Sequence, residues 1–390
     1  MNKRIHYIGQ YSENIFFRNL RVFPSGLTKM NYILSCLEKC DFDITIFSPA
    51  ETKDNLISHY CSHVVSINKK TNLIYIDTFG CPNLIFKILS RLWTFMQIIH
   101  YLFFYVKKDD VVLIYHTWMY RWPLRIVLFF RKLNLYFEVE EIFNAAWKNS
   151  DKAIRNEISY LKGAKGYILV NDMMKENLSI TKPTTVCYGS YISNNTAISK
   201  ASAEIIHIVY AGVIEGKESD IFLAIDILKY LPKNYCLDIL GYGTTENILE
   251  MSAEIDNVNV SLSRVAVIYH GCLSGEEYYS FLAKSHIGLC SRVLEDRYSD
   301  FTFPSKILVY LGNNLVPVCT PIRALMKSSL NGNIIFSENI NAESLAKAIL
   351  AVDLKKNSEF DQIIKKLDKQ FCSELNDLLK NNDKCFIKAN

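Results

Sequence analysis

Short apolar runs rich in β-branched and aromatic residues alternate along the chain with longer stretches of helical periodicity. Runs of this kind, bounded by turn residues and separated by helices, are typical of parallel sheets covered on both faces. In the first half the pattern predicts strands at residues 4–9, 43–48, 111–115, 135–139 and 166–170. In the second half it predicts strands at residues 206–211, 235–240, 267–270, 287–290, 316–319 and 333–336.

The strand–helix series stops at a polar stretch, residues 193–202, and starts again after it. Such a stretch indicates a linker, and 390 residues exceed the ~250–300 that one hydrophobic core accommodates. We therefore predict an α/β fold of two Rossmann-like, doubly wound domains, residues 1–192 and 203–368, facing each other across a cleft. Residues 369–390 read as a charged helical tail, which we expect to pack back on the first domain.

The composition narrows the class of protein. The chain has 44 basic and 40 acidic residues, a net charge of +4, which is too small an excess for a nucleic-acid-binding protein. It suits anionic small ligands or an anionic membrane surface. The 11 cysteines are scattered without a Cys-x-x-Cys pair, which predicts free thiols in a reducing compartment and no zinc site. Because the first residues lack the apolar core of a signal peptide, we expect a cytoplasmic protein.

One segment, residues 84–106, is apolar and aromatic enough to raise the question of a membrane. Lys87 and Arg91 interrupt it, so it falls short of the ~20 apolar residues that a spanning helix needs. Two interpretations remain open. The segment is either a core helix packed on a parallel sheet, which we favour, or an amphipathic helix lying on the inner leaflet of a membrane.

The strongest chemical signal is DFTFPSKILVYLG at residues 300–312, where a loop opens a helix. Proline suits the first helical turn, the Ser305 hydroxyl can cap it, and Gly312 with two asparagines ends the helix before a buried strand. The exposed amides of residues 302–306 and the Lys306 ammonium would make a seat for a diphosphate. The alternative is an ordinary loop–helix–strand unit with an incidental lysine.

Four blocks follow one another in the second half: VYAGVIEGK at 209–217, LDILGYG at 237–243, a strand–turn–helix at 270–291, and FPSKILVYLGNNLVPVC at 303–319. They resemble, in the same order, the donor-binding blocks of family 4 glycosyltransferases of the GT-B fold. The usual form of the last block in that family is F-P-S-K-x-x-E-Y-x-x-x-G-x-P-V. The first half of the chain matches the family more loosely.

The resemblance implies a binding site for a nucleotide-sugar donor, with a UDP-sugar as the expected donor. Gly212 would let the backbone approach the diphosphate, and Lys217 would be the basic partner in that loop. Gly271 to Leu273 would flank the base, next to the glycine turn at Gly241. The implied phosphate contacts are Thr302 and Ser305, which would donate to phosphate oxygens, Lys306, which would neutralise the leaving nucleotide, and Arg292, an alternative contact.

The sequence departs from the family at one position. The glutamate that usually binds the ribose falls on Val309, and the other acidic position of the family's pair falls near Asp300 without a clear glutamate. Glu295, Asp296 and Asp300 lie just upstream and are candidate substitutes. The ribose contact is therefore open.

Candidate residues in the first half lie at predicted strand ends and at one helix start. Gly26 opens a helix, where a small residue allows backbone to approach a sugar phosphate; a plain helix start explains it equally well. His116 follows a strand, in a region where the family often places a histidine near the donor sugar, although a structural role is as probable. Glu138 and Glu140 share one face of a strand end and could orient an acceptor hydroxyl or act as a general base, or simply compensate a helix N-terminus.

Together these features predict a glycosyltransferase that adds a sugar to a polyprenyl-diphosphate-linked saccharide during assembly of a bacterial surface polysaccharide such as O-antigen, capsule or exopolysaccharide. The resemblance implies retention of anomeric configuration. We expect no metal cofactor, because basic side chains can stabilise the leaving nucleotide and no DxD-like site stands out. The acceptor would place the enzyme at the inner leaflet, next to the aromatic and basic residues Trp118, Arg121, Trp122 and Arg125. The rivals are a sugar-nucleotide epimerase of the same architecture and a non-catalytic nucleotide-sugar-binding subunit.

Overall fold

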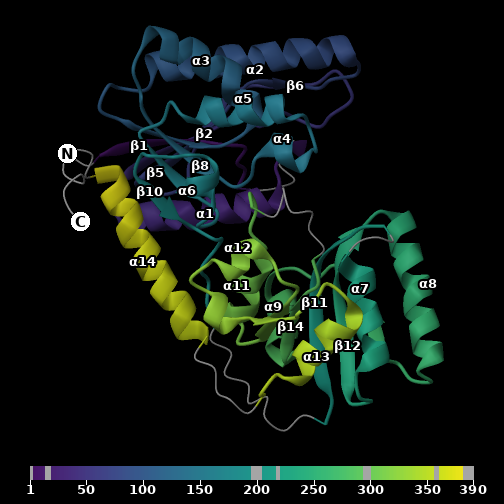
Figure 1. Ribbon diagram of the computed structural model, residues 1–390. Coiled ribbons are helices and arrows are strands. Elements are labelled where there is room, and N and C mark those ends of the chain that lie inside the picture. The colour runs from purple at the N-terminus through teal and green to yellow at the C-terminus, as the bar shows by residue number, and fades with distance from the viewer. Residues whose placement is uncertain are drawn as a thin grey trace. The chain divides into compact units, whose positions relative to one another are not determined.

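The computed structural model describes residues 3–13, 19–194, 204–216, 220–292, 300–354 and 360–380. It divides the chain into two compact units, Met1–Ser190 with Gln370–Asn390, and Tyr191–Lys369. Each unit is built on its own mainly parallel sheet (Figure 1). The predicted α/β class is thereby confirmed. Of the predicted linker, residues 195–202 lie outside the described part of the chain.

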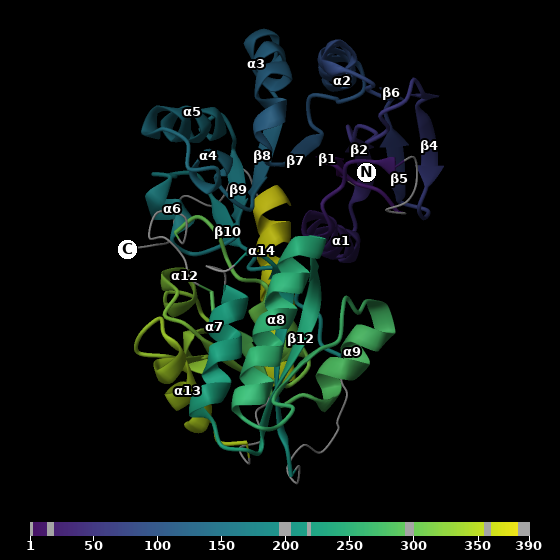
Figure 2. The same cartoon turned by 90° about the vertical axis from the view of Figure 1, so that its right-hand side faces the viewer.

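The first sheet has eight strands in the order β10-β9-β8-β7-β1-β2-β5-β4 (Figure 2). Their bounds are β1 Arg4–Ile8, β2 Asp43–Ser48, β4 His63–Ser66, β5 Thr71–Tyr75, β7 Val111–Tyr115, β8 Asn134–Val139, β9 Gly166–Leu169 and β10 Thr184–Val186. All neighbours run parallel except β4 and β5, which are antiparallel. A separate antiparallel pair is formed by β3, His59–Tyr60, and β6, Thr78–Phe79.

Helices cover both faces of this first sheet (Figure 1). One face carries α2 (Leu84–Phe104), α3 (Arg121–Phe130) and α5 (Asp151–Leu161). The other face carries α1 (Pro24–Lys39) and the last turns of α14 (Phe360–Lys380). Two further helices, α4 (Phe143–Ala146) and α6 (Met174–Asn177), are short. Tyr101 of α2 is hydrogen-bonded to His6 of β1, with 2.7 Å between the hydroxyl and Nδ1. On the opposite face, Phe371 of α14 stacks on Tyr32 of α1. The inner side of each helix is thus fixed by specific side chains.

The second sheet has six strands in the order β13-β12-β11-β14-β15-β16, all parallel. Their bounds are β11 Ile206–Ile214, β12 Tyr235–Gly243, β13 Val267–Tyr269, β14 Ile287–Cys290, β15 Val316–Cys319 and β16 Ile335–Phe336. One face is covered by α7 (Asp220–Asp226), α8 (Thr245–Ser261) and α13 (Ala342–Leu350), the other by α9 (Gly275–Lys284) and α11 (Lys306–Gly312), with the short α12 (Arg323–Met326) beyond β15. An aliphatic core lies under α7, α8 and α13.

All eleven predicted strands are present, to within a few residues at their ends. The sequence analysis missed β3, β4, β5, β6 and β10. In β4 the side chains are half-buried or exposed, so the run of apolar residues that marks a buried parallel strand is absent. β10 has only three residues, too few for a periodic signal.

In each sheet the strand order reverses beside the first strand of the unit: between β1 and β7, and between β11 and β14. In open α/β sheets, ligands bind outside the carboxyl ends of the strands at such a point, because the connections there leave in opposite directions and open a crevice. The carboxyl end of β11, beside this reversal, is therefore the first place to look for a site in the second unit.

A single tyrosine bridges β11 and β14 where they part. The two strands pair only at Ile208–Ile287 and Val209–Gly288. Beyond that, the hydroxyl of Tyr310 from α11 accepts from the N–H of Ala211 at 3.2 Å and donates to the C=O of Leu289 at 3.1 Å. Gly288 permits this approach, since a Cβ there would lie 2.2 Å from the Tyr310 ring. The side chain replaces a strand-to-strand bond.

The N-terminal end of α11 differs from the prediction, whereas the helix ends as predicted at Gly312 and the two asparagines. Ser305 occupies the N-cap position, but its exposed side chain makes no cap hydrogen bond, because its own backbone is already helical. Gly312 is the last residue of the helix, and Asn313 occupies the C-cap. A Cβ at Gly312 would meet the carbonyl oxygen of Ile192 at 2.2 Å. The left-handed residue that ends the helix is Asn314, with φ 56°.

The segment 84–106 forms a helix that combines the two interpretations. The inner side of α2 packs on the sheet through Ser90, Thr94, Ile98, Tyr101 and Leu102, as a core helix does, while most of its other apolar residues are exposed. Among the described residues, no helix has the combined length and apolarity required to cross a bilayer.

The bridge made by Tyr310 predicts a measurable loss of stability in Tyr310→Phe. Removing the hydroxyl leaves the N–H of Ala211 and the C=O of Leu289 buried without their partner, which should lower the free energy of unfolding by about 1–3 kcal/mol. Urea denaturation measures this change. The control is Tyr230→Phe, because Tyr230 is exposed and should tolerate the same deletion. Equal stability of the two variants would contradict the bridge.

Candidate functional site

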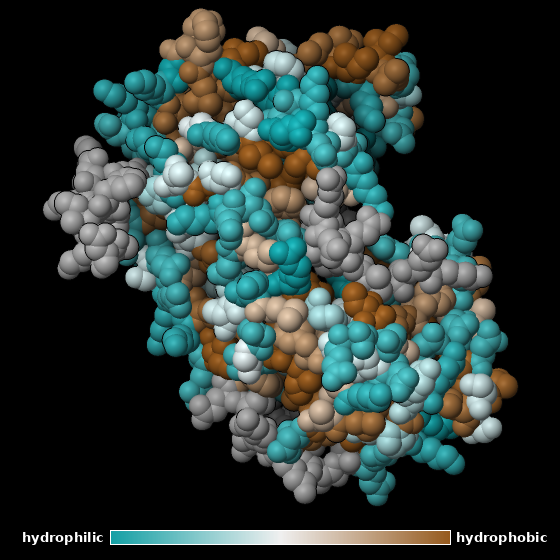
Figure 3. Space-filling model, viewed as in Figure 1, coloured by the Kyte–Doolittle hydropathy of each residue, from teal (hydrophilic) through white to brown (hydrophobic). Residues whose placement is uncertain are grey.

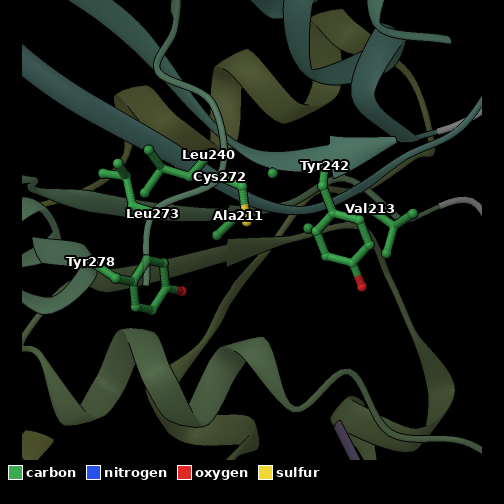
Figure 4. Close-up of a pocket in the computed structure, with 9 residues that line it drawn as sticks. Ala211, Val213, Leu240, Tyr242, Cys272, Leu273 and Tyr278 are labelled. Carbon is green, nitrogen blue, oxygen red and sulfur yellow. The ribbon is translucent and has the colours of Figure 1, made fainter. Parts of the chain in front are cut away.

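A pocket of ≈ 270 Å³ lies at the carboxyl ends of β11 and β12. Its lining comes from the two strand ends, the loop after β13 and α9: Ala211, Gly212, Val213, Leu240, Gly241, Tyr242, Cys272, Leu273 and Tyr278. Figure 4 shows the rings of Tyr242 and Tyr278 on opposite sides of the space, with Ala211 and Cys272 between them. Three of the predicted donor-binding residues, Gly212, Gly241 and Leu273, are therefore brought together.

Glycines shape this pocket by steric necessity. Gly212 and Gly241 are paired across β11 and β12, and a Cβ on Gly241 would lie 2.0 Å from the carbonyl oxygen of Gly212. Gly271 has φ +77°, a left-handed conformation that favours glycine. Its carbonyl accepts from the N–H of Gly241 at 2.9 Å. This bond holds the loop at 271–273 against the strand end.

A buried carboxylate anchors the start of the same loop. Asp238 of β12 is bonded to Nε2 of His270 at 2.7 Å and to Nδ1 of His207 at 2.7 Å. The bond to Asp238 raises the pKa of His207, against the lowering effect of burial. His270 directly precedes Gly271, so this pair fixes where the loop leaves the sheet. The sequence analysis did not identify this pair.

Lys306 lies beside the pocket, at the first residue of α11. Its side chain is 20% exposed. The ammonium lies 4.4 Å from the ring centroid of Tyr210 and 3.2 Å from where a Cβ on Gly212 would be. Among the described residues it pairs with a carboxylate oxygen of Asp220 at 4.0 Å, a distance longer than a hydrogen bond. The cation is thus held at the glycine-lined end of β11.

Two cations, Lys306 and Arg292, also act on the end of β14. The hydrogen bond with Cys319 lowers the pKa of Cys290; burial opposes this, and Lys306 and Arg292 lower it further. At this strand end the field of these two cations, opposed by Asp220, favours negative charge. The same field would favour an anionic group of a ligand placed near Gly212.

The remaining predicted donor residues are spread around this centre. Thr302 is buried and Ser305 is exposed. The Arg292 carbonyl accepts from Thr320 at 2.6 Å, and Asp300 accepts from Arg323 at 3.1 Å. Val309 is half-buried. Lys217, Glu295 and Asp296 lie outside the described residues. Their predicted roles stay predictions.

The first unit contains a second polar cluster, beneath α1. Glu138 is buried and accepts a hydrogen bond from the Tyr7 hydroxyl. Burial, reinforced by Glu140, raises the pKa of Glu138 to about 8, against the lowering effects of Lys29 and Tyr7. Lys29 of α1 pairs with Glu140 at 2.9 Å and donates to the carbonyl of Cys187 at 2.5 Å. Burial alone would lower the pKa of Lys29, but Cys187, Glu140 and Glu138 raise it. Glu138 is therefore a protonated acid near neutral pH, and Lys29 a cation.

His116 lies in the interior of the first unit. It is 1% exposed, its Nε2 is 3.4 Å from a carboxylate oxygen of Glu157, and aromatic rings of Phe143 and Tyr160 surround it. Burial lowers its pKa to about 4, so the imidazole is neutral. A catalytic role for His116, which stays a prediction, would require a path from solvent to this ring.

Gly26 lies where the sheet of the first unit changes direction. A Cβ there would meet the Tyr115 hydroxyl at 3.0 Å, and Gly9 faces Met30 in the same way at 2.6 Å. Both glycines let α1 approach the ends of β1 and β7. The location agrees with the predicted helix start, and contact with a sugar phosphate stays a prediction.

The described residues contain three clusters of histidine, cysteine and carboxylate side chains that could hold a metal ion. Within each cluster the ligand atoms lie within 4.8 Å of one another. One of them contains His207, Cys236 and Asp238. All ten cysteines that the structure describes are free thiols. The expectation that the enzyme needs no metal stays a prediction.

Several site residues escaped the sequence analysis. Tyr210, Tyr242 and Tyr278 read as ordinary apolar positions, since aromatic side chains in strands and helices are usually core. For Lys29, the sequence does contain a signal of burial. Lys29 lies three residues after Gly26, on the side of the helix that also holds Met30 and Ile33, so its side chain is expected to be buried. A buried lysine requires a carboxylate partner.

Neither a family model nor a curated protein matches the chain. Solved structures do match. Trehalose-6-phosphate synthase from E. coli bound with UDP-2-fluoro glucose has 10% identity and a TM-score of 0.67, covering 99% of this chain and 98% of that one. An α,α-trehalose-phosphate synthase (UDP-forming) from Burkholderia xenovorans in complex with glucose-6-phosphate has 10% identity and a TM-score of 0.68, covering 98% and 99%. Sucrose-phosphate synthase from Thermosynechococcus elongatus has 11% identity and a TM-score of 0.67, covering 97% and 99%.

These structures have the GT-B fold of two Rossmann-like domains, and the likeness extends over nearly the whole chain. At this level of identity it establishes the fold. The predicted GT-B architecture is confirmed.

The raised pKa of Glu138 predicts how stability changes with pH. The folded protein keeps this proton up to about pH 8, while an unfolded glutamate loses it near its ordinary pKa of 4.5. Between these values the native state binds more protons than the unfolded state, so stability falls as pH rises, by on the order of a few kcal/mol in total. Glu138→Gln, which mimics the protonated acid, should remove this contribution.

The measurement is the melting temperature of wild type and Glu138→Gln between about pH 5 and about pH 8. The difference between the two proteins should widen in favour of the variant as pH rises. Glu176→Gln at an exposed position serves as the control and should follow wild type. A variant that keeps the full wild-type pH dependence would show that Glu138 is already ionised.

Proposed function

We propose that this protein is a glycosyltransferase that takes its sugar from a nucleotide-sugar, with a UDP-sugar as the expected donor. The observation that carries the proposal is the pocket at the ends of β11 and β12 with the Lys306 ammonium held beside Gly212. An anionic diphosphate fits a site that combines close backbone approach with a positive charge. Two of the matching structures involve uridine nucleotides: one is bound with UDP-2-fluoro glucose, and the other is a UDP-forming enzyme.

In this proposal the base and ribose lie among Cys272, Leu273 and Tyr278, and the diphosphate lies over Gly212. Lys306 stabilises the charge that develops on the departing nucleoside diphosphate, as preorganised electrostatics at a fixed distance. Thr302, Ser305, Arg292 and Lys217 are proposed further phosphate contacts. The ribose contact made by a glutamate in family 4 enzymes has no equivalent at Val309. Asp300 is a candidate, though its carboxylate accepts from Arg323.

The acceptor side is assigned to the first unit. We propose that Glu140 orients or deprotonates the acceptor hydroxyl, because its carboxylate is partly exposed and is paired with Lys29. The buried, protonated Glu138 would support it and not act as the base. Transfer with retention, without a metal ion, is part of the same proposal.

For the acceptor we propose a polyprenyl-diphosphate-linked saccharide of the kind used to build bacterial surface polysaccharides, reached by a cytoplasmic enzyme at the inner leaflet. The blocks that resemble family 4 support this assignment. The alternative is a hexose phosphate, since one matching structure is in complex with glucose-6-phosphate. Presenting both acceptors with the same donor separates the two.

A thermal-shift panel of UDP-, GDP- and dTDP-sugars tests the donor site. One uridine nucleotide should raise the melting temperature of wild type, because a ligand that binds only the native state stabilises it. Lys306→Ala should weaken that binding by about tenfold or more, as expected for loss of a charge-assisted contact worth ~1.5–3 kcal/mol. Lys284→Ala, at an exposed position, is the matched control. An undiminished shift in Lys306→Ala would refute the assignment.

Product analysis tests the reaction itself. Incubation with the stabilising UDP-sugar and either lipid-linked saccharide or hexose phosphate should release UDP and lengthen one acceptor. Conversion of the donor to a different nucleotide-sugar without any acceptor would indicate an epimerase and reject the proposal. Tight binding without turnover on either acceptor would indicate a non-catalytic subunit.

A further inference from the structure

The outer side of α2 is as apolar as its inner side. Its inner residues, from Ser90 to Leu102, are buried against the first sheet. On the opposite side, large apolar residues recur at helical spacing and are exposed: Ile85, Ile88, Leu89, Leu92 and Met96. Leu84, Trp93 and Phe104 extend this exposure along the helix. A helix that is apolar all round belongs in a core or against lipid, and here only one side has a protein partner among the described residues.

Helix α3 continues the same surface. Its exposed residues, Trp122, Ile126, Phe129 and Phe130, also repeat at helical spacing. The two helices are joined near their C-terminal ends: the rings of Phe103 and Phe130 are 6.3 Å apart, and Arg131 donates to the carbonyls of Leu102 and Phe103. Figure 3 shows hydrophobic side chains along the upper edge of this unit, where α2 and α3 lie in Figure 1. We refer to these exposed residues of α2 and α3 as the α2–α3 surface.

All charged residues within α2 and α3 are basic, and the exposed Asp109 lies beyond the end of α2. No aspartate or glutamate occurs from residue 82 to 108 or from 111 to 137. Exposed basic side chains border it at Lys87, Lys107, Lys108, Arg125 and Lys132. The Arg121 guanidinium lies 4.3 Å from the ring of Trp118 and 4.6 Å from that of Trp122. Arg91 of α2 is also basic, but its charge is paired with that of Glu51.

This combination selects among the possible occupants. Contiguous apolar patches of this extent are rare on monomers and mark interaction sites. A second copy placed across a twofold axis would bring the same surface against itself, so basic residues would face basic residues. An anionic lipid surface satisfies both features, because acyl chains take the apolar side chains and headgroups take lysine and arginine, with tryptophan at the boundary.

We propose that the α2–α3 surface docks the protein on an anionic membrane, with α2 and α3 lying in the plane of the headgroups. The docking itself stands independently of the enzymatic reaction. Its purpose, to bring the enzyme to a lipid-linked acceptor, rests on the proposed function.

Co-sedimentation with vesicles tests the docking. Full-length protein should bind vesicles of phosphatidylcholine and phosphatidylglycerol in equal parts at least about tenfold more tightly than vesicles of pure phosphatidylcholine, and salt should weaken the binding. The double variant Leu92→Glu with Met96→Glu should bind the mixed vesicles at least about tenfold more weakly than wild type, because it places charge where acyl chains would lie.

The matched control is Leu249→Glu with Val260→Glu on α8 of the second unit. Leu249 and Val260 are 66% and 78% exposed, compared with 54% and 59% for Leu92 and Met96, so the same chemical change is made at similarly exposed sites. The control should bind vesicles like wild type. Equal binding by wild type and the α2 variant, or equal losses in both double variants, would overturn the assignment of this surface.

Two further measurements separate this inference from its rivals. The α2 variant should keep the wild-type thermal shift with the UDP-sugar, so a docking failure is distinguishable from a failure of the donor site. Light scattering should give the same mass for wild type and the α2 variant. A wild-type dimer that the α2 variant dissociates, together with no vesicle binding, would show that a second copy covers the surface.

Discussion

The separation of β11 and β14 at their carboxyl ends is the constraint on which the second unit depends. β11 stays paired with β12 to its last residue, but it leaves β14 after Val209. The Tyr310 hydroxyl satisfies Ala211 and Leu289 while holding them apart. Because Tyr310 lies on α11, the same contact fixes this helix against the sheet, and with it Lys306 one turn earlier. The position of the cation is thus a consequence of how the strands diverge.

The first unit meets the same constraint with different residues. Its sheet reverses direction between β1 and β7, and two glycines admit α1 there: Gly9 against Met30 and Gly26 against Tyr115. Close approach of α1 inserts Lys29 between Glu140 and the Cys187 carbonyl. Desolvating a lysine is costly unless carboxylates surround it, so Glu138 and Glu140 are tied to α1 for structural reasons before any chemistry is considered. The proposed acceptor side is therefore built from groups that also hold the unit together.

The sequence was sufficient to predict features that rest on a repeating pattern of residues, such as buried strands. It was insufficient to predict features that depend on the position of a single atom, such as one hydrogen bond. Buried strands are recognised by unbroken apolar runs, so all eleven predicted strands were found. β4 was missed because its side chains face solvent, and β10 because it is too short to give a periodic pattern. Gly212, Gly241 and Leu273 could be grouped because the resemblance to family 4 donor-binding blocks implies it, and parallel strands that end at one edge agree with the grouping. The hydrogen bonds of the Tyr310 hydroxyl and the Asp238–His270 bond could not be predicted, because residue spacing does not show which polar atoms form hydrogen bonds with each other. Helix α2 showed the limit of periodicity: apolar residues on all sides predict burial, and the sequence does not say whether protein or lipid provides it.

The composition of the donor pocket has a consequence for specificity. Its lining consists of glycine backbone, aliphatic side chains, a thiol and two tyrosines, so few side-chain donors or acceptors face the ligand. A base held mainly by apolar contact and backbone is discriminated weakly, because hydrogen bonds left unmade are what reject a wrong ligand. Charge at Lys306 acts on the diphosphate, which every nucleotide-sugar shares. On the proposed function, selectivity for uridine must therefore come from backbone groups of the loop at 271–273. That loop is positioned by Gly271 and by the carboxylate of Asp238, and a change at either would alter which nucleotide binds more than how tightly the diphosphate is held.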